Sequence, residues 1–189
     1  TRCANRQVTL SVQGVDRKRD EYKGCGGTIH MEKTNEKYGA YIQILREELI
    51  PAMGCTEPIA VAYAAAVARQ TLGELPDKVI VGASGSIIKN VKSVIVPNTD
   101  NMKGLNTAAA AGIVAGKPEK ELEVIAEVTP EQTEEIKEFL KTAEITVEHV
   151  ENGNTFDIVI SVFKGEKSAK VRIANYHTNI VYIDKNGEV

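Results

Sequence analysis

Cysteine is scarce in this chain, and its scarcity narrows the chemistry that we expect. Only three cysteines occur, at Cys3, Cys25 and Cys55, and no two of them stand in a C-x-x-C or similar spacing. Structural zinc sites draw clustered ligands from such spacings, so the sequence argues against one. So few cysteines, without an N-terminal signal sequence, predict a reduced, cytoplasmic location.

An excess of charge of either sign is lacking as well. The 23 basic and 26 acidic residues leave a net charge of −3, too balanced for a nucleic-acid surface or a membrane-attracted face. The longest apolar run, residues 59–68, falls well short of the ~20 residues that a membrane-spanning helix needs. We therefore expect a small-molecule partner, no nucleic acid and no membrane. The oligomeric state stays open, a homo-oligomer included.

The first thirty residues differ in character from the rest. They hold four of the seven arginines and show no sustained hydrophobic period. Residues 1–30 are interpreted as a leader or vector-derived segment that we expect to be disordered, with Cys3 and Cys25 incidental. Residues 31–189 are expected to form one α+β domain. Because they stop on a strand or hairpin turn, we expect the domain to be truncated.

Hydrophobic periodicity separates a helical part from a β-rich part. Helices are expected at residues 38–50, 59–73, 101–116, 117–128 and 130–143, the second and third being rich in alanine. Short strands are expected at residues 77–84 and 92–98, with a Gly/Ser turn over 83–90. From Glu144 onward four alternating segments predict a meander. The predicted fold class is α+β: alanine-rich helices with short strands, followed by a four-stranded, mainly antiparallel sheet.

One cysteine stands where a helix is expected to begin. In the stretch PAMGCTEPIA, Cys55 precedes Thr56 or Glu57 as the expected helix cap, with Pro58 in the first turn. Aligned backbone dipoles at such a position favour the thiolate, which raises nucleophilicity and metal affinity. Polar neighbours do not suit a cysteine that packs in a core. We therefore interpret Cys55 as functional.

Three chemistries are considered for this thiolate. It can serve as a nucleophile with a histidine base. His177 is the only plausible base, because His149 lies in an alternating strand and His30 lies in the leader. A zinc site lacks the clustered ligands it needs. An iron–sulfur site draws thiolates from distant parts of a chain, and these lie outside the sequence if it is truncated.

Three segments, in order, carry a resemblance to a known family. They are ELIPAMGCTEPIAVAYAAA, IVPNTDNMKGLNTAAAAGIVAGKPEKELEVI and HTNIVYID, within residues 31–189. They resemble the N-terminal part of the L-cysteine desulfidase family, which is related to the iron–sulfur L-serine dehydratase α chain. The resemblance implies a [4Fe-4S] cluster on three cysteines, with one open iron as Lewis acid. It implies β-elimination of L-cysteine to pyruvate, ammonia and sulfide, or of L-serine to pyruvate and ammonia.

The resemblance also assigns roles to residues. Cys55 matches the first cluster ligand, and two further cysteines are expected outside this chain, in a missing C-terminal half or second subunit. The fragment alone is therefore expected to be inactive. His177, in the polar trio HTN, is the candidate general base. Candidate substrate-binding residues are Thr56, Glu57, Ser84, Ser86, Asn98, Thr99 and Asn179.

Two functional hypotheses other than a lyase remain. One is a cofactor-free interaction module or degenerate structural module without activity. The other is a thiol enzyme that uses Cys55 with His177. The loop PNTDN is a point of departure from the family, which commonly has the more glycine-rich PGTG there. Asn98 and Asp100 adopt unusual backbone dihedrals less freely than glycine.

Overall fold

The computed structural model describes residues 36–49, 51–151 and 153–189. The expectations for residues 1–30, Cys3 and Cys25 included, lie outside the described residues. The chain divides into two units, Thr1–Ile44 and Leu45–Val189, which we describe separately. The helix α1 (Glu36–Glu48) starts in the first unit and agrees with the helix predicted at residues 38–50. None of the helices in the described ranges is long and apolar enough to span a bilayer.

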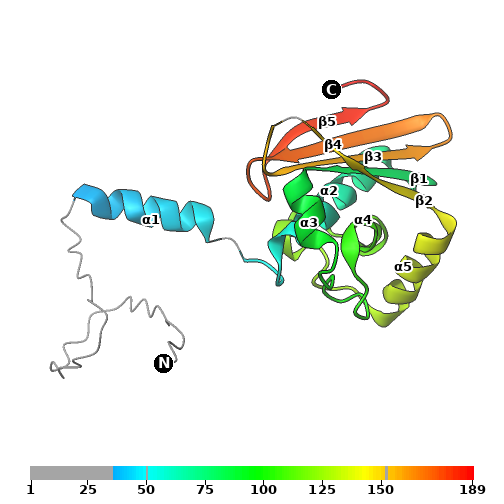
Figure 1. The fold of residues 1–189 in the computed structure, drawn as a ribbon, viewed down its shortest axis with the longest axis horizontal. Helices are drawn as coiled ribbons and strands as arrows, with labels where there is room; N and C mark the ends of the chain where they lie inside the picture. The colour runs from blue at the N-terminus through cyan, green and yellow to red at the C-terminus, as the bar shows by residue number, and fades with distance from the viewer. Residues whose placement is uncertain (1–35, 50, 152) are drawn as a thin grey trace. The chain divides into compact units, whose positions relative to one another are not determined.

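A five-stranded sheet organises the second unit (Figure 1). Its strands are β1 (Lys78–Ala83), β2 (Glu144–His149), β3 (Asp157–Lys164), β4 (Lys167–Ala174) and β5 (Ile180–Lys185), in the order β2-β1-β3-β4-β5. β1 and β2 are parallel, and all other neighbours are antiparallel. The α+β prediction is confirmed, and all four predicted C-terminal strands form. The sheet gains a fifth strand because β1 inserts between β2 and β3, so the predicted meander is confined to β3–β5.

The helices of this unit lie on one side of the sheet, and α2 and α4 contact it (Figure 1). They are α2 (Thr56–Leu72), α3 (Gly85–Val91), α4 (Gly104–Ala115), the 3₁₀ helix η1 (Pro118–Glu123) and α5 (Pro130–Thr142). α2 contacts β3 and β4, and the strand residues that face it, such as Ile160 and Val171, are fully buried. The core therefore lies between α2, α4 and one sheet face.

The contact between α2 and α4 depends on residues without side-chain bulk. A Cβ added at Gly112 in α4 would lie 2.0 Å from the Ala62 carbonyl oxygen in α2, well inside van der Waals contact. Alanines of both helices, among them Ala62 and Ala109, are completely buried. The alanine-rich composition thus permits an approach that larger side chains would block. It holds the backbone of α2 in one position.

Three local predictions are wrong. Residues 92–98 form no strand, since Ile95 makes a single bridge to Lys103. The segment expected as a Gly/Ser turn contains α3, whose backbone bonds start at Ser84. Instead of a helix over residues 117–128 the structure has η1, which is interrupted where Glu121 adopts a φ of 47°. In each case a short segment fitted more than one local structure.

Candidate functional site at the N-terminus of α2

The candidate site lies where several elements end close together. β1 and β4 both end where β3 begins, because Ala83 pairs with Ile158 and Ala174 pairs with Asp157. The turn after β4 carries His177, which reaches the first residue of α2. α3 contributes Asn90 through a contact with the first turn of α2. We call Cys55, Thr56, Glu57, Asn90 and His177 the thiol cluster.

Cys55 is the N-cap residue of α2, with an extended backbone (φ −69°, ψ 123°) and an exposed side chain. No side chain caps the helix, so the expectation that Thr56 or Glu57 is the cap is wrong. The thiol instead donates a hydrogen bond to Glu57 Oε2, with 2.9 Å between sulfur and oxygen. Its position directly before α2 and in solvent agrees with the prediction.

The protonation of Cys55 is opposite to what the helix position alone predicts. Partial desolvation raises the pKa of the Cys55 thiol above its usual value, and the hydrogen bond to the Glu57 carboxylate raises the pKa further. The Glu57 backbone N–H lowers the pKa, as expected of a helix N-terminus, but the other causes outweigh it. The prediction of a favoured thiolate is therefore corrected: Cys55 is a thiol near neutral pH.

Glu57 connects the thiol to α3. Its second oxygen, Oε1, accepts a hydrogen bond of 3.1 Å from Asn90 Nδ2. The hydrogen bond from Cys55 is the main cause that lowers the pKa of Glu57, so the carboxylate is ionised near neutral pH. Sequence reasoning missed Asn90 because its segment was interpreted as a turn. A helix over that segment would have placed Asn90 in its last turn.

Thr56 and His177 are joined directly. Thr56 Oγ1 lies 2.9 Å from His177 Nε2, although 121 positions separate the two residues in the chain. The ring of Phe156 packs on the imidazole, with 4.6 Å between ring centroids and 60° between planes. Burial lowers the pKa of His177, and the charge of Glu57 opposes this shift only in part. A neutral imidazole at pH 7 can accept a proton.

Phe156 directly precedes β3, and the ion pair at the first residue of that strand supports its position. Asp157, the next residue, is completely buried, and its carboxylate accepts hydrogen bonds from Arg172 Nε (3.1 Å) and Nη2 (2.6 Å). This ion pair raises the pKa of Arg172. Phe156 was not among the residues singled out from the sequence, because its alternating segment indicated only a strand. The ion pair and the ring contact connect the sheet to His177.

Asn179 closes the turn that carries His177. Its Nδ2 donates a hydrogen bond of 3.0 Å to the Ala174 carbonyl, and its own carbonyl accepts one from the Ala174 N–H. The candidate substrate-binding amide is thus engaged by the backbone. It shapes the turn between β4 and β5.

The two candidate serines lie at the start of α3. Ser84 is 3% exposed, and its hydroxyl donates a hydrogen bond of 2.7 Å to the Thr155 carbonyl, next to Phe156. Ser86, two residues on, is exposed. Ser84 therefore ties the end of β1 to the segment that supports His177, while Ser86 faces solvent.

Asn98 and Thr99 belong to a separate loop. Asn98 donates hydrogen bonds to the carbonyls of Ile125 and Ala126, and the buried Thr99 hydroxyl donates to the Val96 carbonyl. Asn98, Asp100 and Asn101 all adopt positive φ angles, between 55° and 61°, so these residues take the conformation that glycine would favour. None of the hydrogen bonds found for Asn98 and Thr99 leads to the thiol cluster. The preceding Pro97 borders Gly54, one residue before Cys55.

The described residues do not by themselves fit an iron–sulfur cluster. Cys55 is the only cysteine among them, and they contain no group of three or more histidine, cysteine, aspartate or glutamate side chains that could hold a metal ion. They offer one exposed sulfur ligand beside a carboxylate and an imidazole. The remaining ligands of any cluster would have to lie elsewhere.

Known proteins resemble this chain over most of its length. It is 53% identical over 161 residues to a UPF0597 protein of Desulfitobacterium hafniense, a match that covers 85% of this chain and 37% of that protein. The chain is homologous to UPF0597 proteins. Others are the UPF0597 proteins of Lachnoclostridium phytofermentans, 45% identical over 80% of this chain, and of Treponema denticola, 42% identical over 84%.

The match covers only a part of each relative. The chain spans 36% of the L. phytofermentans protein and 37% of the T. denticola protein. No family model matches the chain. Well over half of each UPF0597 relative therefore has no counterpart in this sequence, and the name UPF0597 states no activity.

Proposed function

We propose that this chain contributes one part of an iron–sulfur lyase of the cytoplasm, which eliminates sulfide from L-cysteine or water from L-serine to give pyruvate and ammonia. The observation that carries the proposal is the geometry of the thiol cluster. An exposed sulfur ligand, Cys55, directly precedes Thr56, which is hydrogen-bonded to a neutral imidazole, His177. A metal ligand next to a base is one arrangement that supports β-elimination from an amino acid, because the metal polarises the leaving group while the base removes the α proton.

The proposed cofactor is a [4Fe-4S] cluster with Cys55 as one of three ligands. When bound, such a cluster supplies a Lewis acid at an iron that no protein residue occupies. Because the described residues provide one thiol, we assign the other two ligands to the part of the UPF0597 proteins that this chain does not span. The chain alone is then expected to be inactive.

His177 is the proposed base for the α proton of the substrate. With Nδ1 protonated, Nε2 is the accepting atom, and in this structure Nε2 bonds to the Thr56 hydroxyl. Thr56 thus orients the imidazole toward the end of α2 that carries Cys55. The packed ring of Phe156 restricts the imidazole as well. Together the two contacts hold the base in one orientation before substrate binds.

The candidate substrate-binding residues fall into two groups, according to whether their side chains bond to backbone carbonyls. Glu57 bonds to the sulfur of Cys55 and Thr56 bonds to His177, and we propose that both contact the substrate. Ser86 is exposed and stays a candidate of the same kind. The remaining four have side chains bonded to backbone carbonyls, and we assign them the shaping of the site: Ser84, Asn98, Thr99 and Asn179.

A full-length hybrid tests the proposal: the D. hafniense UPF0597 protein with its matching segment replaced by this chain. After anaerobic reconstitution with iron and sulfide, we expect pyruvate to form from L-cysteine or L-serine, and an iron chelator to abolish it. His177→Gln should lower the rate by about 10²- to 10⁴-fold, the usual contribution of a general base. His149→Gln, a change to an exposed histidine on β2, should leave the rate unchanged.

The same assay separates the two rivals. A thiol enzyme would keep its activity in the chelator and lose it irreversibly on alkylation of Cys55. The observed contacts do not favour this reading, because Cys55 bonds to Glu57 and His177 bonds to Thr56. An interaction module would form the complete protein but give no product under any of these conditions. Either result would refute the lyase.

A further inference from the structure

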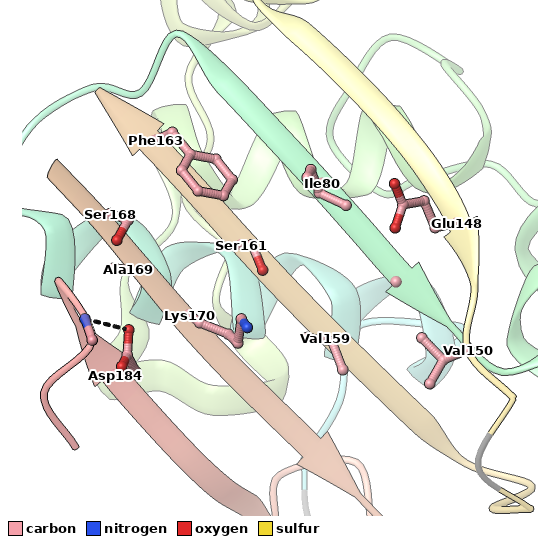
Figure 2. Close-up of a pocket in the computed structure, with 12 residues that line it drawn as sticks. Ile80, Glu148, Val150, Val159, Ser161, Phe163, Ser168, Ala169, Lys170 and Asp184 are labelled. Carbon is pink, nitrogen blue, oxygen red and sulfur yellow. Dashed lines mark hydrogen bonds between the residues drawn. The ribbon is translucent and has the colours of Figure 1, made fainter. Parts of the chain in front are cut away.

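The sheet face turned away from α2 is hollowed at its centre (Figure 2). The hollow has a volume of about 530 Å³ and lies over β1, β3 and β4. It exists because three of its positions hold small residues, Gly82, Ser161 and Ser168. Larger apolar side chains surround them: Ile80, Val159 and Phe163. An antiparallel sheet commonly exposes one face to water, but that face is then mainly polar.

A second hollow continues the first toward the edge of the sheet. It has a volume of about 390 Å³ and is lined by Val159, Lys170, Arg172, Val181 and Tyr182. Val159 and Lys170 line both hollows. The two therefore form one depression that extends from β1 to β5, which we call the sheet trough.

The polar residues of the trough are arranged unlike those of a solvated face. Ser161 is only 8% exposed and Asp184 only 9%, although no described helix covers this side of the sheet. At the rim, Glu148 on β2 and Lys170 on β4 stand on opposite sides of the apolar floor (Figure 2). Within the described ranges neither of them forms an ion pair. Asp184, opposite Lys170 on β5, forms no ion pair in the described ranges either, but it accepts hydrogen bonds from the Tyr182 hydroxyl and the Gly187 N–H. The trough thus combines an apolar floor with Lys170 and Glu148 at its rim.

We propose that the sheet trough is the docking surface for the part of the UPF0597 proteins that lies outside the match with this chain. That part makes up well over half of each relative, and α2 and α4 already cover the opposite face of the sheet. The docked segment has apolar side chains that fill the two hollows, an anion near Lys170 and a cation near Glu148. Like the proposed function, the proposal relies on the part of the UPF0597 proteins that this chain does not span. It does not depend on the [4Fe-4S] cluster.

Labelling of lysines with an amine-reactive reagent tests the docking surface. The reagent is applied to the isolated chain and to the full-length hybrid, both without iron, and labelling is read at each lysine by mass spectrometry. We expect the labelling rate of Lys170 to fall at least tenfold in the hybrid. Lys141 on α5, with 73% of its side chain exposed, should react equally in both proteins.

Equal labelling of Lys170 in both proteins would overturn the proposal. Protection of Lys170 in the isolated chain that grows with its concentration would overturn it too, because the occupant would then be a second copy. Since neither protein contains iron, failure of the cluster assignment would leave this result unchanged.

A substitution in the floor of the trough gives a second test. Ser161→Arg should restore the labelling of Lys170 in the hybrid, because its side chain occupies the space that the docked segment needs. The control, Glu166→Arg, places the same residue in the exposed turn between β3 and β4, and Lys170 should stay protected. Continued protection of Lys170 in a folded Ser161→Arg hybrid would contradict the assignment.

Discussion

The body of α2 and the thiol cluster at its N-terminus are held in different ways. Along the body, buried alanines lie against α4 so closely that one added methyl group would collide with backbone. In the cluster, side chains are exposed or half-buried and are held by one hydrogen bond each, or two in the case of Glu57. The helix body therefore fixes the position of the site, whereas the cluster can exchange hydrogen-bond partners at small cost in stability. Substitutions in the two regions should therefore have separable effects.

The largest effect is expected where α4 packs against the body of α2. Gly112→Ala places a Cβ 2.0 Å from the Ala62 carbonyl oxygen, so α2 and α4 must separate. We expect the free energy of unfolding to fall by about 3 kcal/mol or more, measured by chemical denaturation. Gly39→Ala is the control, because it adds the same methyl group to a helix where nothing lies within 4 Å. Equal stability of the two variants would contradict the close contact.

A smaller loss is expected where the sheet supports the cluster. Arg172→Met leaves the buried carboxylate of Asp157 without its guanidinium partner. We expect a loss of about 2–4 kcal/mol, toward the low end because Arg172 is partly exposed. Lys170→Met, the next outward-facing residue on β4, serves as the control and should change the stability of the isolated chain by no more than about 0.5 kcal/mol. A tolerated Arg172→Met would show that the pair does not support Phe156.

Single hydrogen bonds of the cluster should contribute less still. Thr56→Val removes the bond to His177, and we expect a loss of about 1 kcal/mol. Thr71→Val removes a hydroxyl that bonds to the Val67 carbonyl within α2, which we expect to change stability by less than about 0.5 kcal/mol. Paired denaturation curves decide between them. If Thr71→Val lowers the free energy of unfolding more than Thr56→Val does, these two hydrogen bonds contradict the contrast between the helix body and the thiol cluster.

Glu57→Gln should change protonation with little change in stability. The Glu57 carboxylate accepts the thiol proton and repels the thiolate, and both effects raise the pKa of Cys55. Removing the charge should therefore lower that pKa, so that alkylation of Cys55 reaches half of its maximal rate at a lower pH. Glu151→Gln changes an exposed glutamate elsewhere and should leave the profile in place. An unchanged or higher midpoint in Glu57→Gln would contradict the role of the carboxylate.

Much of the fold follows from sequence pattern where the pattern is long. The alanine-rich segments gave α2 and α4, and strict alternation after Glu144 gave four strands. Short segments were harder, because residues 92–98 and α3 each contain apolar runs that suit a strand, a turn or a helix. The place of β1 between β2 and β3 is set by long-range pairing, for which no local signal exists.

The candidate site likewise has features that the local sequence predicts and features that depend on the fold. Cys55 before a helix was predictable from glycine and proline around it, but the Thr56–His177 bond spans 121 positions and required the fold. The predicted ionisation of Cys55 has the wrong sign, because partial desolvation of the thiol and the carboxylate two residues away together outweigh the dipole of α2 in setting its pKa. Side-chain geometry, and not residue type, decided that outcome.

The iron content of two cysteine variants tests the ligand assignment most directly. Full-length hybrids that carry Cys55→Ala or Cys25→Ala are reconstituted anaerobically with iron and sulfide, and bound iron, labile sulfide and the broad charge-transfer absorption are measured. We expect Cys25→Ala to match the unsubstituted hybrid, and Cys55→Ala to lose the absorption band and its bound iron. A Cys55→Ala protein that keeps a full cluster would contradict the assignment of this sulfur as a ligand.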